Sequence, residues 1–148
     1  MNHNNLPVKK LFCIFNGTNH KNKTMSTSNS YSLGLLVLRV GISAMLLIHG
    51  IQKIEILFSS EINFSDPIGI GSTVTLILVL FAEIICTILI IIGFKTRLAT
   101  IPPIILMFVA VAIVHKGDPF MARELALLYL IAFTAIGLLG GGRIALKS

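Results

Sequence analysis

Glu83 is the residue whose type and place in the sequence most clearly indicate chemistry. It is the only charged residue in an apolar run from about 73 to 94, and it lies near the middle of that run. Bringing an ionisable side chain to the centre of a membrane costs at least about 2.5 kcal/mol on insertion scales, so such a residue is a functional candidate. Glu83 therefore predicts a polar site near the bilayer midplane, where a carboxylate needs a cation within reach to stay ionised.

Three further ionisable residues share one face of the preceding apolar run, from about 33 to 58. Arg39, His49 and Lys53 fall, with Leu46, within about 80° of one another when each residue turns roughly 100° around a helix. This stripe is expected to face the bundle interior, where Glu83 would lie. Arg39 on the inner side and His49 on the outer side are the two candidates for a cation that reaches Glu83.

A second polar group is predicted at the outer ends of the helices. His49 and Lys53 lie near the end of the first run, while His115 ends the third run and Glu124 begins the fourth. Histidine titrates near neutral pH, so a pocket of these side chains could take up or release protons. That property suits a quinone headgroup, because its carbonyls need hydrogen-bond donors and its reduction takes up protons. No cysteine pair or His/Cys spacing indicates a metal site.

Structural roles are the alternative for each of these residues. Arg39, Lys53 and Glu124 lie within two turns of a helix end, from where their side chains could reach the lipid headgroups. His115 could be an ordinary loop residue. Glu83 could form a structural ion pair or a hydrogen bond between helices. Both interpretations stay open at this point.

The elements that must position these residues are predicted to be four transmembrane helices in an all-α bundle. Of the 148 residues, 55% are hydrophobic and only 12% are charged, against about 25% charged in a soluble domain. Apolar runs long enough to cross the hydrocarbon lie at about 33–58, 73–94, 98–115 and 123–141. No alternating pattern indicates a membrane barrel. Pro102 and Pro103 are expected in the first turns of the third helix, and Gly140–Gly142 is expected to end the fourth.

The distribution of Lys and Arg predicts that both termini are cytoplasmic. Residues 1–32 carry four of the twelve Lys and Arg, and the link between the first two helices carries none. The polar residues 1–32 are predicted to form a disordered cytoplasmic tail, and residues 33–148 the membrane domain. The net charge of +6 comes mostly from this tail. No basic stripe interleaved with aromatic residues is present, so a nucleic-acid partner is excluded.

Three separated segments follow one another in an order and spacing that resemble a known family. The first contains LRVG (38–41) and HGIQK (49–53), and the second contains FAE (81–83) and GFKTR (93–97). The third contains His115, then ELALLYL (124–130) and GGGR (140–143). Together, over about residues 33–146, they resemble the DoxX family of small four-span membrane proteins of bacteria and archaea.

The resemblance implies a redox-associated role, because the family takes its name from a subunit associated with archaeal thiosulfate:quinone oxidoreductase and terminal oxidase complexes. It implies a multi-pass protein of the bacterial cytoplasmic membrane, in contact with lipids and with an oxidoreductase partner subunit or further copies of itself. No haem, flavin or iron–sulfur motif is visible in the sequence. No covalently bound cofactor is therefore predicted, and quinone is the candidate ligand.

Three functions are compatible with the sequence. The first is an accessory, quinone-associated subunit of a membrane redox complex. The second is a proton-coupled small-molecule transporter that uses Glu83. The third is a non-catalytic scaffold or assembly factor, in which the buried charges only fix helix packing. The sequence leaves open whether the chain is itself catalytic.

Overall fold

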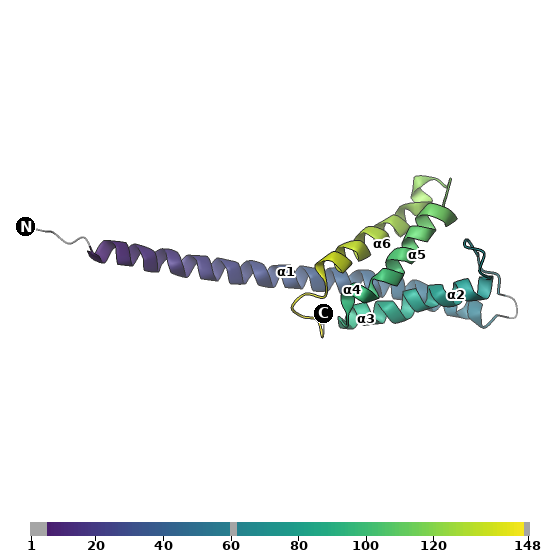
Figure 1. Cartoon of the computed structure of the whole chain (residues 1–148), viewed down its shortest axis with the longest axis horizontal. Coiled ribbons are helices and arrows are strands. Elements are labelled where there is room, and N and C mark those ends of the chain that lie inside the picture. The colour runs from purple at the N-terminus through teal and green to yellow at the C-terminus, as the bar shows by residue number, and fades with distance from the viewer. Residues whose placement is uncertain (1–5, 60–61, 147–148) are drawn as a thin grey trace, which may run out of the picture. The chain divides into compact units, whose positions relative to one another are not determined.

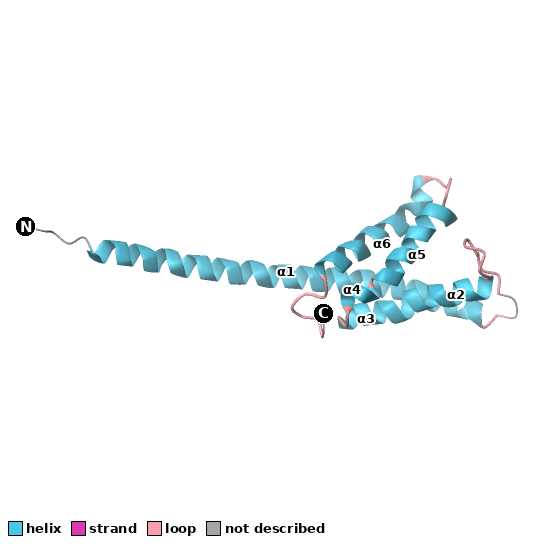
Figure 2. Cartoon of the chain, in the orientation of Figure 1, coloured by secondary structure: helices cyan, strands magenta, loops and turns pink. Residues whose placement is uncertain are grey.

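The computed structural model describes residues 6–59 and 62–146, and within the first helix it describes side chains from residue 29 onward. The chain divides into two units, residues 1–34 and 35–148. All regular structure among the described residues is helical (Figures 1 and 2). Within the described ranges, four helical stretches are long and apolar enough to cross a membrane, which confirms the predicted all-α architecture; they are Asn29–Leu57, Ser72–Ile92, Thr96–Val114 and Phe120–Leu139.

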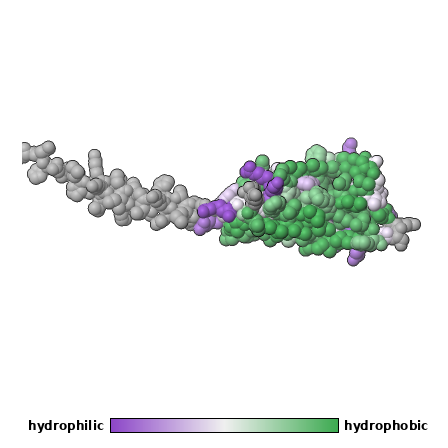
Figure 3. Space-filling model, turned by 60° about the horizontal axis from the view of Figure 1, so that its bottom comes forward, coloured by the Kyte–Doolittle hydropathy of each residue, from purple (hydrophilic) through white to green (hydrophobic). Residues whose placement is uncertain are grey.

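The surface of the second unit is that of a protein surrounded by hydrocarbon. One face, drawn in Figure 3, is covered almost continuously by hydrophobic residues, and hydrophilic residues lie mostly at its margins. Many large apolar side chains are exposed, among them Val37, Ile48, Ile105 and Ile131. In water an apolar surface of this extent would drive association, whereas in a bilayer it contacts lipid chains.

The first helix, α1, runs from Leu6 to Leu57. The structure differs here from the sequence prediction, because residues 6–32 of the predicted disordered tail are helical; residues 1–5 lie outside the described residues. Once a helix has formed, each added residue gains a backbone hydrogen bond without a new nucleation cost, so the membrane helix can extend toward the N-terminus.

The second membrane helix contains a wider turn at its centre. Its three parts are α2 (Ser72–Leu80), the π-helix η1 (Phe81–Cys86) and α3 (Thr87–Ile92). π turns are rare and occur frequently at functional sites. The helix ends at Gly93, whose φ of 82° is in the left-handed region. Gly93 N–H donates to the Ile90 carbonyl at 3.1 Å and Phe94 N–H to the Leu89 carbonyl at 3.0 Å, which is the hydrogen-bond pattern of a Schellman cap.

The third membrane helix is also composite. Its parts are α4 (Thr96–Ala99), α5 (Ile101–Val109) and the π-helix η2 (Ala110–Val114). Pro102 and Pro103 lie in the first turn of α5 rather than at the start of the whole span, because the short α4 precedes them. The two prolines cannot donate hydrogen bonds to the α4 carbonyl groups one turn earlier, which fits the break between α4 and α5.

The fourth helix, α6, runs from Phe120 to Leu139, three residues earlier at its start than predicted. It ends where expected, because Gly140 and Gly142 adopt φ values of 78° and 70°. α5 and α6 pack against each other. Residues from all four spans form the buried core, which comprises Leu46, Ile90, Ala99, Met107, Tyr129, Phe133 and Ile136.

Candidate functional site

Helix α1 lies close against η1 at Gly50. A Cβ atom placed on Gly50 would lie 2.8 Å from Ile84 Cγ1 and 2.9 Å from Glu83 Cβ, closer than real side chains pack. Only a glycine therefore allows the two helices to meet at this point. The contact brings the turn of α1 that follows Gly50 beside Glu83.

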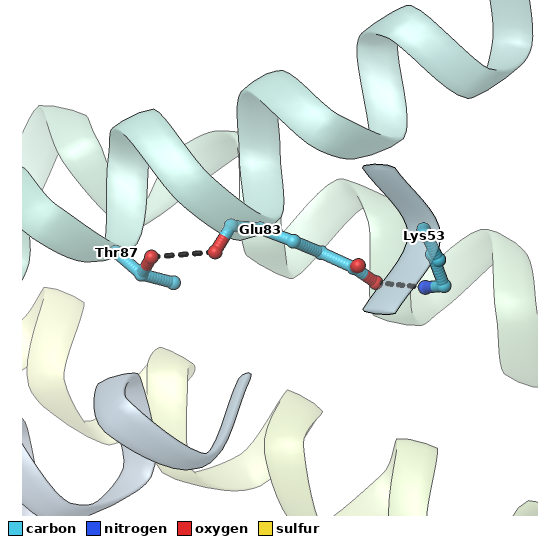
Figure 4. Close-up of polar contacts among 3 residues, drawn as sticks. All are labelled: Lys53, Glu83 and Thr87. Carbon is cyan, nitrogen blue, oxygen red and sulfur yellow. Dashed lines mark hydrogen bonds and ion pairs between the residues drawn. The ribbon is translucent and has the colours of Figure 1, made fainter. Parts of the chain in front are cut away.

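Lys53, on that next turn, is the cation that reaches Glu83. Its Nζ donates a hydrogen bond to Glu83 Oε1, and the two side chains point toward each other in Figure 4. The Glu83 side chain is only 3% exposed, whereas the Lys53 side chain is 30% exposed. The pair is therefore buried on the carboxylate side and open on the ammonium side.

The prediction that Arg39 would reach Glu83 is wrong, although the stripe faces inward as expected. His49, the other predicted candidate, lies near Glu83, but the hydrogen-bonded partner is Lys53. Side chains on a helix tilt toward its N-terminus. Lys53, near the C-terminal end of α1, therefore points back toward the level of Glu83. Arg39 points toward the opposite membrane face, away from the carboxylate.

The carboxylate of Glu83 keeps one oxygen free for another partner. Within the described residues, Glu83 Oε2 and the Tyr129 hydroxyl are buried without a hydrogen-bond partner. The Thr87 hydroxyl instead donates to the backbone carbonyl of Glu83 at 2.5 Å, as Figure 4 shows, and to that of Ile84 at 2.9 Å. Buried polar atoms without partners are costly, so Oε2 is available for a ligand or proton.

Two aromatic residues of α6, Tyr129 and Phe133, form a chain of ring contacts with His49 of α1. The His49 ring meets the Tyr129 ring edge to face at 6.1 Å between centroids, and Tyr129 stacks on Phe133 at 6.3 Å. Tyr129 is 2% exposed. A half-buried histidine of α1 and a buried tyrosine of α6 thus lie together inside the bundle, and both side chains can form hydrogen bonds.

A cavity of about 610 Å³ opens onto the Lys53–Glu83 pair. Its walls come from α2, η1, α5, η2 and the link between the first two spans. Apart from Lys53, Glu83, Ser65 and Thr75, every lining side chain is apolar. A mostly apolar cavity of this size with a few convergent polar groups has the features of a small-molecule site.

Asp66 organises the link that borders this cavity. Its carboxylate accepts hydrogen bonds from the N–H groups of Gly69, Ile70 and Gly71, at 3.0, 3.2 and 2.6 Å, and from the Thr75 hydroxyl at 2.9 Å. The bond from Gly71 is the main cause that lowers the pKa of Asp66, against an opposing effect of desolvation. Asp66 thus anchors the link to the first turn of α2, where its negative charge also suits the helix dipole.

Arg39 occupies a separate, closed site at the other end of the bundle. It is 1% exposed, and its Nη1 donates to the Gly141 carbonyl at 2.6 Å, just beyond the end of α6. A Cβ on Gly93 would lie 2.8 Å from the same Nη1. The guanidinium therefore sits among glycines and carbonyl groups at helix ends, where a positive charge is favoured.

The predicted outer pocket of His49, Lys53, His115 and Glu124 is not formed by the described residues. His115 Nδ1 lies 3.0 Å from Asp118 Oδ2 in the link before α6, and Glu124 is exposed. The chain turns away at Gly117, whose φ is 95°, so His115 pairs within its own link. His49 and Lys53 join Glu83 and Tyr129 deeper in the bundle instead.

Sequence reasoning missed Asp66, Tyr129 and the two π-helices. Asp66-Pro67-Ile68-Gly69 has the Asp and Pro preferences of a turn, which is a signal for an ordered link. Tyr129 is one of two tyrosines in the chain and lies inside an apolar run, where its hydroxyl needs a partner. No pattern in this sequence predicts the two π-helices.

Comparison with known families gives one match. The sequence profile of the DoxX family matches residues 34–116, more than half of the chain, which includes Arg39, His49, Lys53, Glu83 and His115. The third resembling segment, from Glu124 onward, lies beyond the matched residues. Neither curated proteins nor solved structures gave a match. The chain therefore belongs to the DoxX family of membrane proteins.

Proposed function

We propose that the protein is a quinone-associated accessory subunit of a membrane redox complex, and that the Lys53–Glu83 pair holds the quinone headgroup. The observation that carries this proposal is the position of the pair on the wall of an otherwise apolar cavity. A headgroup with two carbonyls needs a hydrogen-bond donor and, on reduction, a neighbour that passes it a proton, which Glu83 can do when Oε2 is protonated. Lys53 and Glu83 supply these two groups.

The residues present fit such a group. Lys53 Nζ has three N–H donors, of which Glu83 Oε1 uses one, and its side chain is partly exposed. Glu83 Oε2 is buried and has no partner among the described residues. The remaining walls provide apolar contacts for a ring and exclude water. Neither polar group has to lose a protein partner before it can bind.

A bound quinone would supply reversible two-electron, two-proton chemistry, and the electrons would come from a partner subunit. Lys53 would orient the headgroup and stabilise negative charge on the carbonyl oxygen nearest its Nζ. Glu83 would hold or release a proton at Oε2. Tyr129 and His49, behind the pair, would keep this region polar on the side away from the cavity.

We further propose that both termini face the cytoplasm in a bacterial cytoplasmic membrane. The lysines near the N-terminus and the Lys95–Arg97 turn support this orientation. The link that carries Asp66 would then lie on the outer side, and the cavity would occupy the outer half of the bilayer. The partner subunit that donates electrons would then have to approach the quinone from the outer leaflet of the bilayer.

The test measures quinone in the purified protein and its effect on stability. Protein in mild detergent should carry extractable quinone, and added short-chain ubiquinone or menaquinone analogues should raise its melting temperature. A ligand at a hundred times its Kd adds about 2.7 kcal/mol to the folded state. Glu83→Gln should abolish the rise, and Glu124→Gln, a carboxylate exposed on α6, should keep it.

Three results would contradict the proposal. The first is purified protein that carries no extractable quinone and whose melting temperature does not rise when quinone is added. A proton-gradient-driven uptake of small molecules into vesicles that Glu83→Gln abolishes would favour the transporter instead. Lower stability of Glu83→Gln, with no quinone effect in the wild type, would favour the scaffold.

A further inference from the structure

We infer that the ligand of the Lys53–Glu83 cavity passes directly between cavity and bilayer, through an apolar portal between α2–η1 and α5. The portal is formed by Leu78, Phe81 and Ile105. This inference rests on the proposed function and adds the class of ligand: a compact headgroup with hydrogen-bond acceptors on a long apolar tail. This class of ligand does not include small, water-soluble molecules.

The rim of the cavity is apolar where it is exposed. Leu78 is 53% exposed, Phe81 48% and Ile105 58%, and all three also line the cavity. A residue that lines a cavity and is also widely exposed lies at its mouth, and by this criterion Ile68, Ile70 and Val114 extend the apolar rim to the link and the end of η2. Because Leu78, Phe81 and Ile105 belong to membrane-spanning helices, their part of the mouth opens toward lipid chains.

Two polar side chains of the cavity wall lie away from its exposed rim. Glu83 is 2% exposed and Thr75 is 6% exposed, and both line it. A ligand that enters through the portal therefore meets apolar walls first and the Lys53–Glu83 pair last. This gradient matches an amphipathic molecule whose headgroup enters and whose tail stays among the lipids.

The link between the first two spans covers the cavity on its aqueous side. Phe64, Pro67 and Ile68 of this link line the cavity. The Asp66 carboxylate accepts three N–H hydrogen bonds from within the link and one from the Thr75 hydroxyl, which joins the link to the first turn of α2. A ligand from water would have to pass this fixed link, whereas a ligand from lipid meets only side chains at the portal.

The chain contains no tryptophan, so a single introduced tryptophan reports on its own surroundings. Phe81→Trp places the reporter at the portal. Phe108→Trp is the matched control, because Phe108 is 61% exposed on α5 but does not line the cavity. If Phe81→Trp fails to fold, Ile105→Trp places the reporter on the opposite side of the portal.

The first measurement reconstitutes these variants into vesicles with brominated acyl chains. Brominated chains should quench Phe81→Trp, and aqueous iodide should leave its fluorescence unchanged. Quenching by iodide and not by the brominated chains would overturn the portal. This result does not depend on whether any quinone binds.

The second measurement adds quinones to vesicles of unmodified lipid. Ubiquinone with a long isoprenoid tail, which stays in the bilayer, should cause a saturable loss of Phe81→Trp fluorescence, and only a non-saturable loss for Phe108→Trp. Quenching by a tail-less quinone alone would overturn the portal while the proposed function stands. If neither quinone quenches Phe81→Trp, the proposed function is contradicted. The experiment with brominated lipids then still tests the portal by itself.

Discussion

Arg39 and Lys53 are both cations on the inward face of α1, yet their surroundings differ in kind. Arg39 is fully enclosed, and its guanidinium donates a hydrogen bond to the Gly141 backbone carbonyl. Lys53 is partly exposed to a cavity and pairs with the carboxylate of Glu83. A backbone carbonyl is fixed by the fold, whereas a carboxylate can gain or lose a proton and can exchange partners.

The comparison shows that a charge inside the membrane is not by itself a sign of chemistry. Arg39 joins the end of α6 to α1 and the Gly93 turn, so its contribution is to hold helix ends together. Lys53 and Glu83 join α1 to η1 but also face an open volume. Burial and partner type together separate a structural cation from a candidate ligand-binding cation.

The largest effect is expected from Arg39→Leu, which removes the structural cation. The Gly141 carbonyl would lose its donor inside the protein, and the leucine would leave part of the guanidinium volume empty. We expect a loss of about 2–4 kcal/mol in the free energy of unfolding, measured by denaturant titration in mild detergent. Arg39→Lys should lose less, because it keeps the charge but not the planar donor fork. Wild-type stability of Arg39→Leu would show that the enclosed site is not structural.

A second comparison uses two glycines on α1. Gly50→Ala should push α1 away from η1, because its Cβ would meet Ile84 and Glu83 at 2.8–2.9 Å. We expect a loss of about 1–3 kcal/mol in stability and a weaker quinone-dependent rise in melting temperature. Gly41 has nothing within 4 Å of an added Cβ, so Gly41→Ala should gain about 0.5–1 kcal/mol through helix propensity. Equal effects of the two substitutions would argue against close contact at Gly50.

The smallest effect is expected at Asp66, in the link over the cavity. Its pKa is lowered in the folded protein, mainly by the Gly71 N–H. The carboxylate therefore contributes stability above its unfolded pKa, and this contribution disappears as the pH falls through the lower, folded pKa. Melting curves from neutral to acidic pH should show a smaller pH dependence for Asp66→Asn than for the wild type. Unchanged pH dependence in Asp66→Asn, with Glu124→Gln as control, would contradict this role.

The sequence predicts the elements of this fold better than their contacts. The lone charge in residues 73–94, the inward stripe that contains Arg39, and the stop at Gly140 follow from composition, helical period and glycine chemistry. The pairing of Glu83 with Lys53 depends on the close approach of the helices at Gly50 and on the tilt of the side chains. The position of a residue along its helix specifies neither of these. The π turn around Glu83 depends on tertiary packing, so the helical period alone gives no sign of it.

The outer ends of the helices illustrate the same limit. His115 and Lys53 were expected at one level because each lies near a helix end. The turn at Gly117 instead pairs His115 with Asp118. A link of a few residues can redirect a side chain, and its conformation is set by local hydrogen bonds that helical periodicity does not encode.

The central claim is that Lys53 and Glu83 serve a ligand and are not needed for folding. The most direct measurement combines Lys53→Met with Glu83→Gln and records melting curves with and without a quinone analogue. Replacing both members of a buried pair is often neutral or stabilising, so the unfolding free energy should stay within about 1 kcal/mol of the wild type or rise. The quinone-dependent rise in melting temperature should be lost. A double variant that loses several kcal/mol, or one that keeps the full quinone effect, would contradict the claim.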